Sequence, residues 1–154
     1  MHRIRRYSVM VAAGGMLVAG LMVSSLPATA KATPAPKLKV SPASKLTNDE
    51  IVNVSGSHFT PSDSIFIIEC VVGETSTTGT GCNIAGDIGP ETVSSKGTWG
   101  PVQFKVLTGA IGTQGGMCGT TTANAKDCAV SAGDAQGNDG AQKAFKFLVP
   151  KTKK

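Results

Sequence analysis

The sequence predicts an all-β sandwich, because short β-prone runs alternate with turn residues along the chain after residue 38. No apolar stretch in that part keeps a helical period for more than a turn or two, so strands are the only regular elements that the pattern supports. Four cysteines, an even count in a small chain with an export signal, indicate disulfides. We therefore expect one exported β domain whose strands are held by two disulfides.

The first 30 residues predict a signal peptide that is not part of the fold. Basic residues precede an apolar run from Val9 to Val23, and Ala28-Thr29-Ala30 supplies a small-x-small cleavage pattern. The run has fifteen residues. A bilayer span needs about 20, so an uncleaved anchor is the weaker alternative. We expect cleavage after Ala30 or Ala32 and secretion of a mature chain without a membrane span.

The mature chain divides into three parts by composition. Residues 31–37 are polar and contain two prolines, which predicts a flexible linker. Residues 38–149 contain the β-prone runs, and residues 150–154 form a basic tail. Six lysines and ten carboxylates between Val40 and Val149 give this region a net charge of −4. No arginine remains after cleavage, so direct DNA binding by a basic face of the protein is not expected.

Seven runs have the composition of strands, with turn residues between them. They are Leu38–Val40, Glu50–Ser55, Ile65–Val72, Glu91–Val93, Trp99–Val106, Ala129–Ser131 and Ala144–Val149. The run from Ile65 is apolar on both sides, which predicts a central strand. Seven strands at these spacings are typical of a sandwich. The six aromatic residues of the mature chain are expected mainly in its core.

The four cysteines are all expected to form disulfides, and three pairings are possible. They are Cys70, Cys82, Cys118 and Cys128. Pairing sequence neighbours would close loops with eleven and nine residues between the cysteines. Each loop of that order contributes about 3 kcal/mol in the chain-entropy model. A zinc site is the alternative, but no C-x-x-C pair is present and one histidine remains after cleavage, so we expect no metal.

No residue of the mature chain is predicted to be catalytic. His58 is its sole histidine, and a lone histidine is more often a surface turn residue than a general base. The sequence has no G-x-S-x-G elbow and no carboxylate pair at a useful spacing. Gly137 and Asn138 lie between Asp134 and Asp139 in the sequence. This composition favours a turn over a weak calcium site. We expect a protein that is not an enzyme.

Six segments, taken in order, carry a resemblance to a known family. They are Val40–Ser44 with Val52–Ser57, Glu69-Cys70 with Cys82-Asn83, Cys128–Asn138, and Phe145-Lys146-Phe147. Their order, the placement of the cysteines and the length resemble the neocarzinostatin family of enediyne antibiotic carriers over about residues 38–149.

The resemblance implies an immunoglobulin-like, seven-stranded Greek-key sandwich extended by a disulfide-closed β-ribbon. It also implies a non-catalytic carrier that binds an enediyne-type chromophore non-covalently between sandwich and ribbon. The partner is then a small hydrophobic ligand, and DNA is reached only indirectly, through the released ligand. A preformed apolar cleft and rigid disulfide-held walls suit the protection of such a molecule. We expect the carrier to be a monomer.

The residues that the resemblance places at the cleft are small or aliphatic. They are Ile68, Val72, Ile88, Leu107, Ile111, Met117 and Gly133. Val72 stands where the best-known family member has a tryptophan, and Ile68 stands where it has a glycine. The loop from Leu107 to Met117 lacks the aromatic residues that cover the ligand there. We therefore expect a smaller or more aliphatic ligand than the family's enediynes.

A secreted immunoglobulin-like surface module without a ligand is the alternative function. Sandwich domains commonly serve adhesion, and a fold alone does not establish a function. The basic ends of the mature chain would then attach the domain to anionic wall polymers or lipid surfaces. The sequence leaves both possibilities open and does not identify a ligand.

Overall fold

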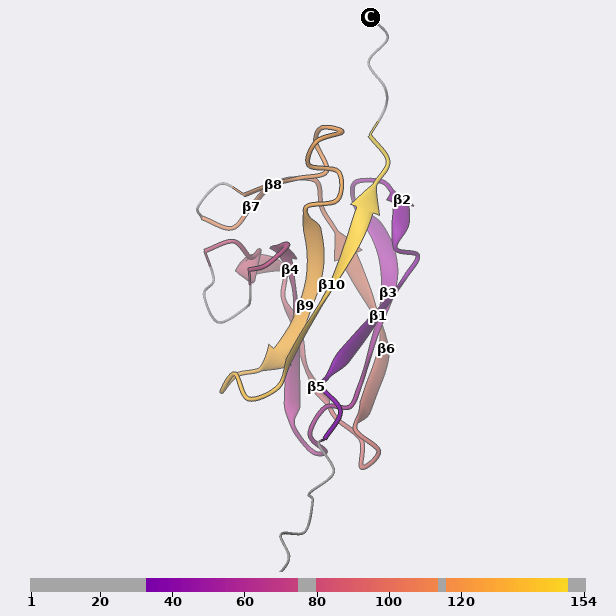
Figure 1. The fold of residues 1–154 in the computed structure, drawn as a ribbon, viewed down its shortest axis with the longest axis vertical. Helices are drawn as coiled ribbons and strands as arrows, with labels where there is room; N and C mark the ends of the chain where they lie inside the picture. The colour runs from indigo at the N-terminus through magenta and orange to yellow at the C-terminus, as the bar shows by residue number, and fades with distance from the viewer. Residues whose placement is uncertain (1–32, 75–79, 114–115, 150–154) are drawn as a thin grey trace, which may run out of the picture. The chain divides into compact units, whose positions relative to one another are not determined.

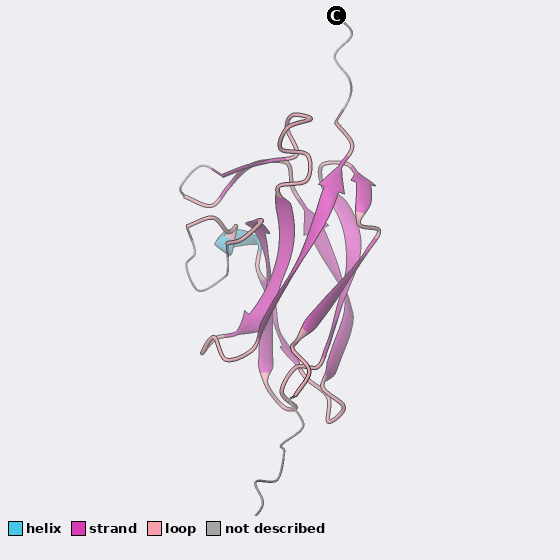
Figure 2. Cartoon of the chain, viewed as in Figure 1, coloured by secondary structure: helices cyan, strands magenta, loops and turns pink. Residues whose placement is uncertain are grey.

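The structure is a computed structural model that describes residues 33–74, 80–113 and 116–149. The predicted signal peptide, residues 1–30, and the basic tail, residues 150–154, lie outside the described residues. The described part contains ten strands and one short 3-10 turn, η1 (Ile84–Gly86) (Figures 1 and 2). None of its helical segments has the length and hydropathy needed to cross a bilayer.

The strands form two packed sheets and a separate two-stranded ribbon (Figure 1). One sheet has the order β1-β3-β6, with bounds Lys37–Ser41, Glu50–Ser57 and Thr98–Val106. The other has the order β2-β10-β9-β4-β5, with bounds Ser44–Leu46, Gly140–Phe147, Cys128–Asp134, Ser64–Val71 and Ile88–Thr92. Strands β7 (Gly109–Ile111) and β8 (Gly116–Cys118) form the ribbon, and both contact β4.

The all-β prediction is confirmed, and the strand number in the described residues is ten. Each of the seven predicted runs overlaps a strand of five or more residues. The additional strands β2, β7 and β8 have three residues each, which is too short to leave a periodic pattern in the sequence. The cysteines form the local pairs Cys70–Cys82 and Cys118–Cys128.

The core lies between the two sheets, because alternate residues of each strand point inward. Val52 and Val54 of β3 are completely buried, while the intervening Asn53 is exposed. Ile65 and Ile67 supply the inner face of β4. Fully burying one such aliphatic side chain contributes about 1.5–3 kcal/mol, so this alternation is the main source of stability.

Trp99 packs over a glycine of the neighbouring strand. Its ring meets Phe59 edge to face at 5.7 Å between centroids, and its buried indole N–H has no hydrogen-bond partner within the described residues. Gly56 of β3 lies directly beneath, and a Cβ there would overlap the indole. The position of the ring therefore depends on close packing against a residue that has no side chain.

We predict that Gly56→Ala destabilises the domain by about 1–3 kcal/mol, because the added methyl group overpacks the indole. Gly140→Ala is the matched control, since a Cβ on this β10 glycine would meet nothing within 4 Å. Urea unfolding followed by circular dichroism measures both variants. Equal stability of Gly56→Ala and the parent would show that the Trp99 ring is free to move.

Candidate ligand-binding site

The five-stranded sheet has an outer face that points away from the sandwich core. Phe66, Ile68 and Cys70 of β4 project from it, since they alternate with the inward Ile65 and Ile67. The register places small residues of β9 beside them, with Phe66 opposite Gly133, Ile68 opposite Ser131 and Cys70 opposite Ala129. All seven residues of β9 are buried, so its outer face must be covered as well as its inner face.

The cysteine-closed segment after β4 supplies part of this cover. Cys70 is bonded to Cys82, and the peptide N–H of Val71 donates to the carbonyl of Gly81 at 2.9 Å. The N–H of Asn83 donates to the carbonyl of Glu69 at 2.8 Å. These bonds hold the returning chain beside the end of β4, so the residues of η1 follow directly at the edge of the outer face.

Gln142 of β10 anchors the start of the same segment. Its amide nitrogen donates to the carbonyl of Glu74 at 2.5 Å and to Ser131 Oγ at 2.8 Å. Its amide oxygen accepts the N–H of Gly73 at 2.8 Å. The polar groups of half-buried Gln142 and buried Ser131 therefore pair with Gly73 and Glu74 and fix their position.

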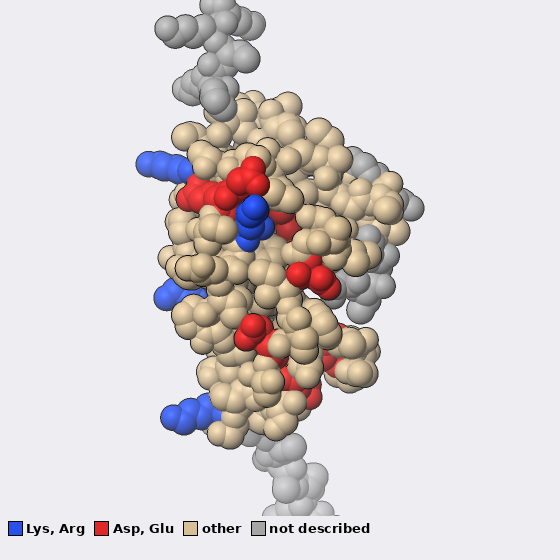
Figure 3. Space-filling view, turned by 180° about the vertical axis from the view of Figure 1, so that it is seen from behind, with Lys and Arg blue, Asp and Glu red and all other residues tan. Residues whose placement is uncertain are grey.

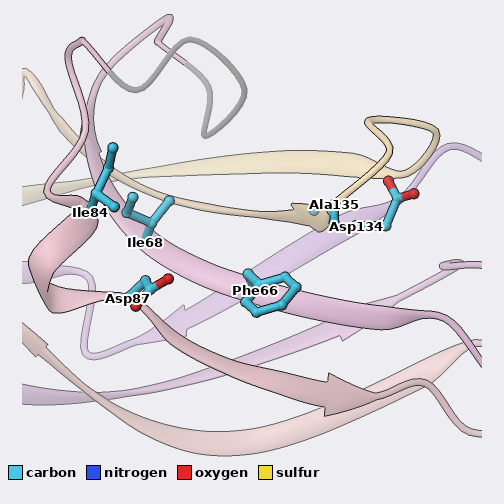
Figure 4. Close-up of a pocket in the computed structure, with 7 residues that line it drawn as sticks. Phe66, Ile68, Ile84, Asp87, Asp134 and Ala135 are labelled. Carbon is cyan, nitrogen blue, oxygen red and sulfur yellow. The ribbon is translucent and has the colours of Figure 1, made fainter.

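An open hollow of about 200 Å³ remains on the outer face (Figure 4). Its lining residues are Phe66, Ile68, Ile84, Asp87, Gly133, Asp134 and Ala135. Figure 4 shows Ile84 beside Ile68, and Asp134 beyond Ala135 at the other end. Pockets that bind drug-sized ligands have volumes of roughly 300–1,000 Å³. This smaller hollow therefore accepts a small molecule or one part of a larger one.

The polar end of the hollow is a turn built on Asp134. The N–H of Asp139 donates to Asp134 Oδ1 at 2.8 Å, and the Asn138 amide donates to Oδ2 at 3.2 Å. The hydrogen bond from the Asp139 N–H is the main reason that the pKa of Asp134 lies below its usual range, and other donors of the turn add to the effect. The hollow therefore has an apolar floor and a carboxylate that stays ionised at one end.

Acidic side chains are also spread over the far side of the domain. Figure 3 shows them across the face seen from behind, where most of the visible lysines project from one edge. No lysine lines the hollow. Among the described residues, the charged groups that line the hollow are therefore the carboxylates of Asp87 and Asp134.

Two of the seven predicted cleft residues, Ile68 and Gly133, line the hollow. Ile88 packs against the sandwich core instead, because the register pairs it with inward-facing Ile67. Ile111 is 1 % exposed and belongs to the same core. The structure therefore places the first two residues at the hollow and both of these isoleucines in the sandwich core.

The other three predicted residues lie outside the hollow. Val72 and Met117 have exposed side chains, and Leu107 is half-buried at the end of β6. Their contact with a ligand stays a prediction, as does that of Ile68 and Gly133.

Five lining residues were not expected at the site. They are Phe66, Ile84, Asp87, Asp134 and Ala135. Phe66 was expected in the core with the other aromatic residues. The alternation of side chains along β4 could have placed Phe66 on the same face as Ile68. No pattern in the sequence indicates that η1 returns to this face.

Glu69 is a buried carboxyl that joins β4 to the start of the ribbon segment. It is 1 % exposed, and its Oε2 accepts the N–H of Leu107 at 2.9 Å. The buried disulfide sulfur of Cys118 lies 3.9 Å from its Oε1. Burial raises the pKa of Glu69 to about 7, against the opposing effect of the Leu107 hydrogen bond.

A β-sandwich with a preformed apolar hollow beside a disulfide-held segment has the form of a small-molecule-binding domain. The chain belongs to the neocarzinostatin family, whose family model matches residues 38–147. The solved structure of macromomycin is 30 % identical, with a TM-score of 0.52, and the match covers 74 % of this chain and 100 % of that one. Apokedarcidin is 26 % identical with a TM-score of 0.49, covering 75 % and 100 %. No match is found among the curated proteins.

We predict that stability falls as the pH rises from about 4.5 to 7, because folded Glu69 keeps a proton that the unfolded chain releases. Below this window both states are protonated, and above it both are ionised. The loss is on the order of 3 kcal/mol. Glu69→Gln should remove it and be more stable than the parent at pH 8.

Urea unfolding at pH 5, 6, 7 and 8 measures this dependence. Glu91→Gln, which removes a carboxyl from β5 outside the Glu69 site, is the control. Parallel pH profiles for the parent and Glu69→Gln would refute the assignment.

Proposed function

We propose that this chain is a secreted, non-catalytic carrier that binds and protects a labile hydrophobic small molecule. By family relationship the ligand is an enediyne-type chromophore, which would act on DNA after its release. The observation that carries the proposal is the preformed apolar hollow on Phe66 and Ile68 at the disulfide-closed end of β4. Membership of the neocarzinostatin family supports the same function.

The geometry of the hollow suits protection of a ligand. Its floor lies on β4, which is paired on both sides, and the Cys70–Cys82 disulfide adjoins Ile68 in one apolar cluster. A site held in this way loses little conformational entropy on binding, so more of the contact energy appears as affinity. The Phe66 ring offers a planar apolar surface for an aromatic or polyunsaturated ligand.

Two observations support export of the carrier. Both cysteine pairs are oxidised in a small domain, which is typical of proteins outside the cytosol. The sequence before residue 31 has the pattern of a cleaved signal peptide.

A surface module without a ligand is the second candidate. The small volume of the hollow favours it, because Ile68 occupies a part of the floor that a glycine would leave open. Binding measurements therefore decide between the two functions.

We expect native mass spectrometry of the protein from its own culture medium, kept cold and dark, to show an added small-molecule mass. Organic extraction should remove that mass together with a near-ultraviolet absorbance. A bare mass of residues 31–154 or 33–154 less four hydrogens would favour the surface module.

We also predict that Phe66→Ala weakens binding of the neutral dye Nile red at least about fivefold, since an aromatic contact is worth roughly 1 kcal/mol. Ile51→Ala, which truncates an exposed side chain on the other sheet, should leave the dissociation constant unchanged. Dye fluorescence titration measures both. Gly133 is a poor position for this test, because a Cβ there would lie 2.9 Å from the Asp139 carbonyl oxygen. Unchanged affinity in Phe66→Ala would exclude the hollow as the dye site.

A further inference from the structure

A second concavity, larger than the hollow and sharing no residue with it, lies where β2 meets the end of β10. Its volume is about 440 Å³. That volume is within the range of small-molecule sites. We call it the basic groove and define it by Lys45, Ala125, Lys146, Phe147 and Leu148, all of which line it.

The floor of the basic groove is apolar and well fixed. Phe147 and Ala125 are 2 % and 4 % exposed, and the Phe147 N–H donates to the Ala125 carbonyl at 2.8 Å. The Phe147 ring also packs edge to face on Phe145 at 5.3 Å between centroids. Leu148, by contrast, is 59 % exposed and presents an apolar side chain at the rim.

The charge of the groove is opposite to that of the domain. Lys45 and Lys146 line it and no carboxylate does, although the region from Val40 to Val149 has six lysines against ten carboxylates. Three further lysines follow Val149 within five residues of sequence. This arrangement favours an anionic ligand and disfavours the chain's own basic tail as the occupant.

A strand irregularity places Lys45 at the groove. The parallel register of β2 and β10 pairs Ser44 with Lys146 and Leu46 with Phe147, so Lys45 is an extra residue between two successive pairs. Its φ is 60°, in the left-handed region. A lysine in this conformation is costly, and bulges of this kind occur where a side chain must be re-aimed. Strained residues of this kind cluster at functional sites.

The flanking backbone maintains this conformation. The Lys146 N–H donates to the Ala43 carbonyl at 3.0 Å, and the Leu148 N–H donates to the Leu46 carbonyl at 2.7 Å. Leu46 is completely buried, so β2 cannot slip to relieve the bulge without exposing it.

From this combination we propose that the basic groove binds a small anionic amphiphile, an organic acid with an apolar body. The apolar body contacts Leu148 at the rim and the small exposed parts of Phe147 and Ala125, and the carboxylate pairs with the ammonium groups of Lys45 and Lys146. The concave shape and the volume of the groove suit one molecule of free acid, whereas a lipid surface would require a flat or convex basic face. This site is additional to the carrier hollow and does not depend on it.

Isothermal titration of the mature chain with dodecanoate, below its critical micelle concentration, tests the proposal. We expect saturable binding of one molecule, weakened by added salt, and at least tenfold weaker binding of dodecyltrimethylammonium, which has the same tail and the opposite charge. Equal binding of the two amphiphiles would overturn the proposal. So would binding of anionic vesicles without binding of the free acid.

Two variants locate the site. Lys45→Gly and Lys146→Gln should each raise the dissociation constant for dodecanoate by up to about fivefold, the effect of losing one exposed charge pair. Because glycine accepts a left-handed φ, Lys45→Gly should keep or raise the Tm, so lost binding cannot be attributed to unfolding. Lys96→Gln and Phe66→Ala are the controls, and both should bind dodecanoate as tightly as the parent does. Unchanged affinity in both lysine variants, or loss in Phe66→Ala, would refute the basic groove as the site.

Discussion

The antiparallel pairing of β4 with β9 is the contact on which the rest of the structure depends. Both strands are buried on two faces, so one side of the pair supplies the sandwich core and the other needs a separate cover. The described residues on either side of the Cys70–Cys82 disulfide meet part of this need, with Gly73 and Glu74 held to the sheet by Gln142. The cover is incomplete beyond Ile68, and the hollow is the part of the outer face that it leaves open.

The sequence predicted the elements that have a period and missed those that depend on tertiary contacts. The run from Ile65 was recognisable as a central strand because it is apolar on both faces, and the cysteine count indicated disulfides without giving the pairing. Of the residues predicted by resemblance, Ile68 and Gly133 line the hollow, whereas Ile88 and Ile111 belong to the sandwich core. The local pattern could not separate these positions, because register is decided by pairing partners that it does not reveal.

The basic groove could not be predicted for a related reason. Lys45 follows Ser44 in a segment of three residues, and its left-handed conformation arises only when β2 pairs in parallel with β10. In the sequence, Lys45 and Lys146 are two separated lysines of an acidic region. Only the fold brings them to the same apolar floor.

The two concavities differ in a way that separates their ligands. The hollow ends in Asp134, whose carboxylate is kept ionised by the donors of its turn, while the groove is lined by two lysines. An anionic amphiphile is repelled at the first and attracted at the second, and a cationic molecule experiences the reverse, whereas net charge does not direct a neutral molecule to either. Glu69 adds no charge to either concavity, because it is buried between β4 and the ribbon segment and lines neither of them. One small β domain can therefore present two concavities of opposite charge, since the hollow is built mainly on β4 and β9 and the groove on β2 and β10.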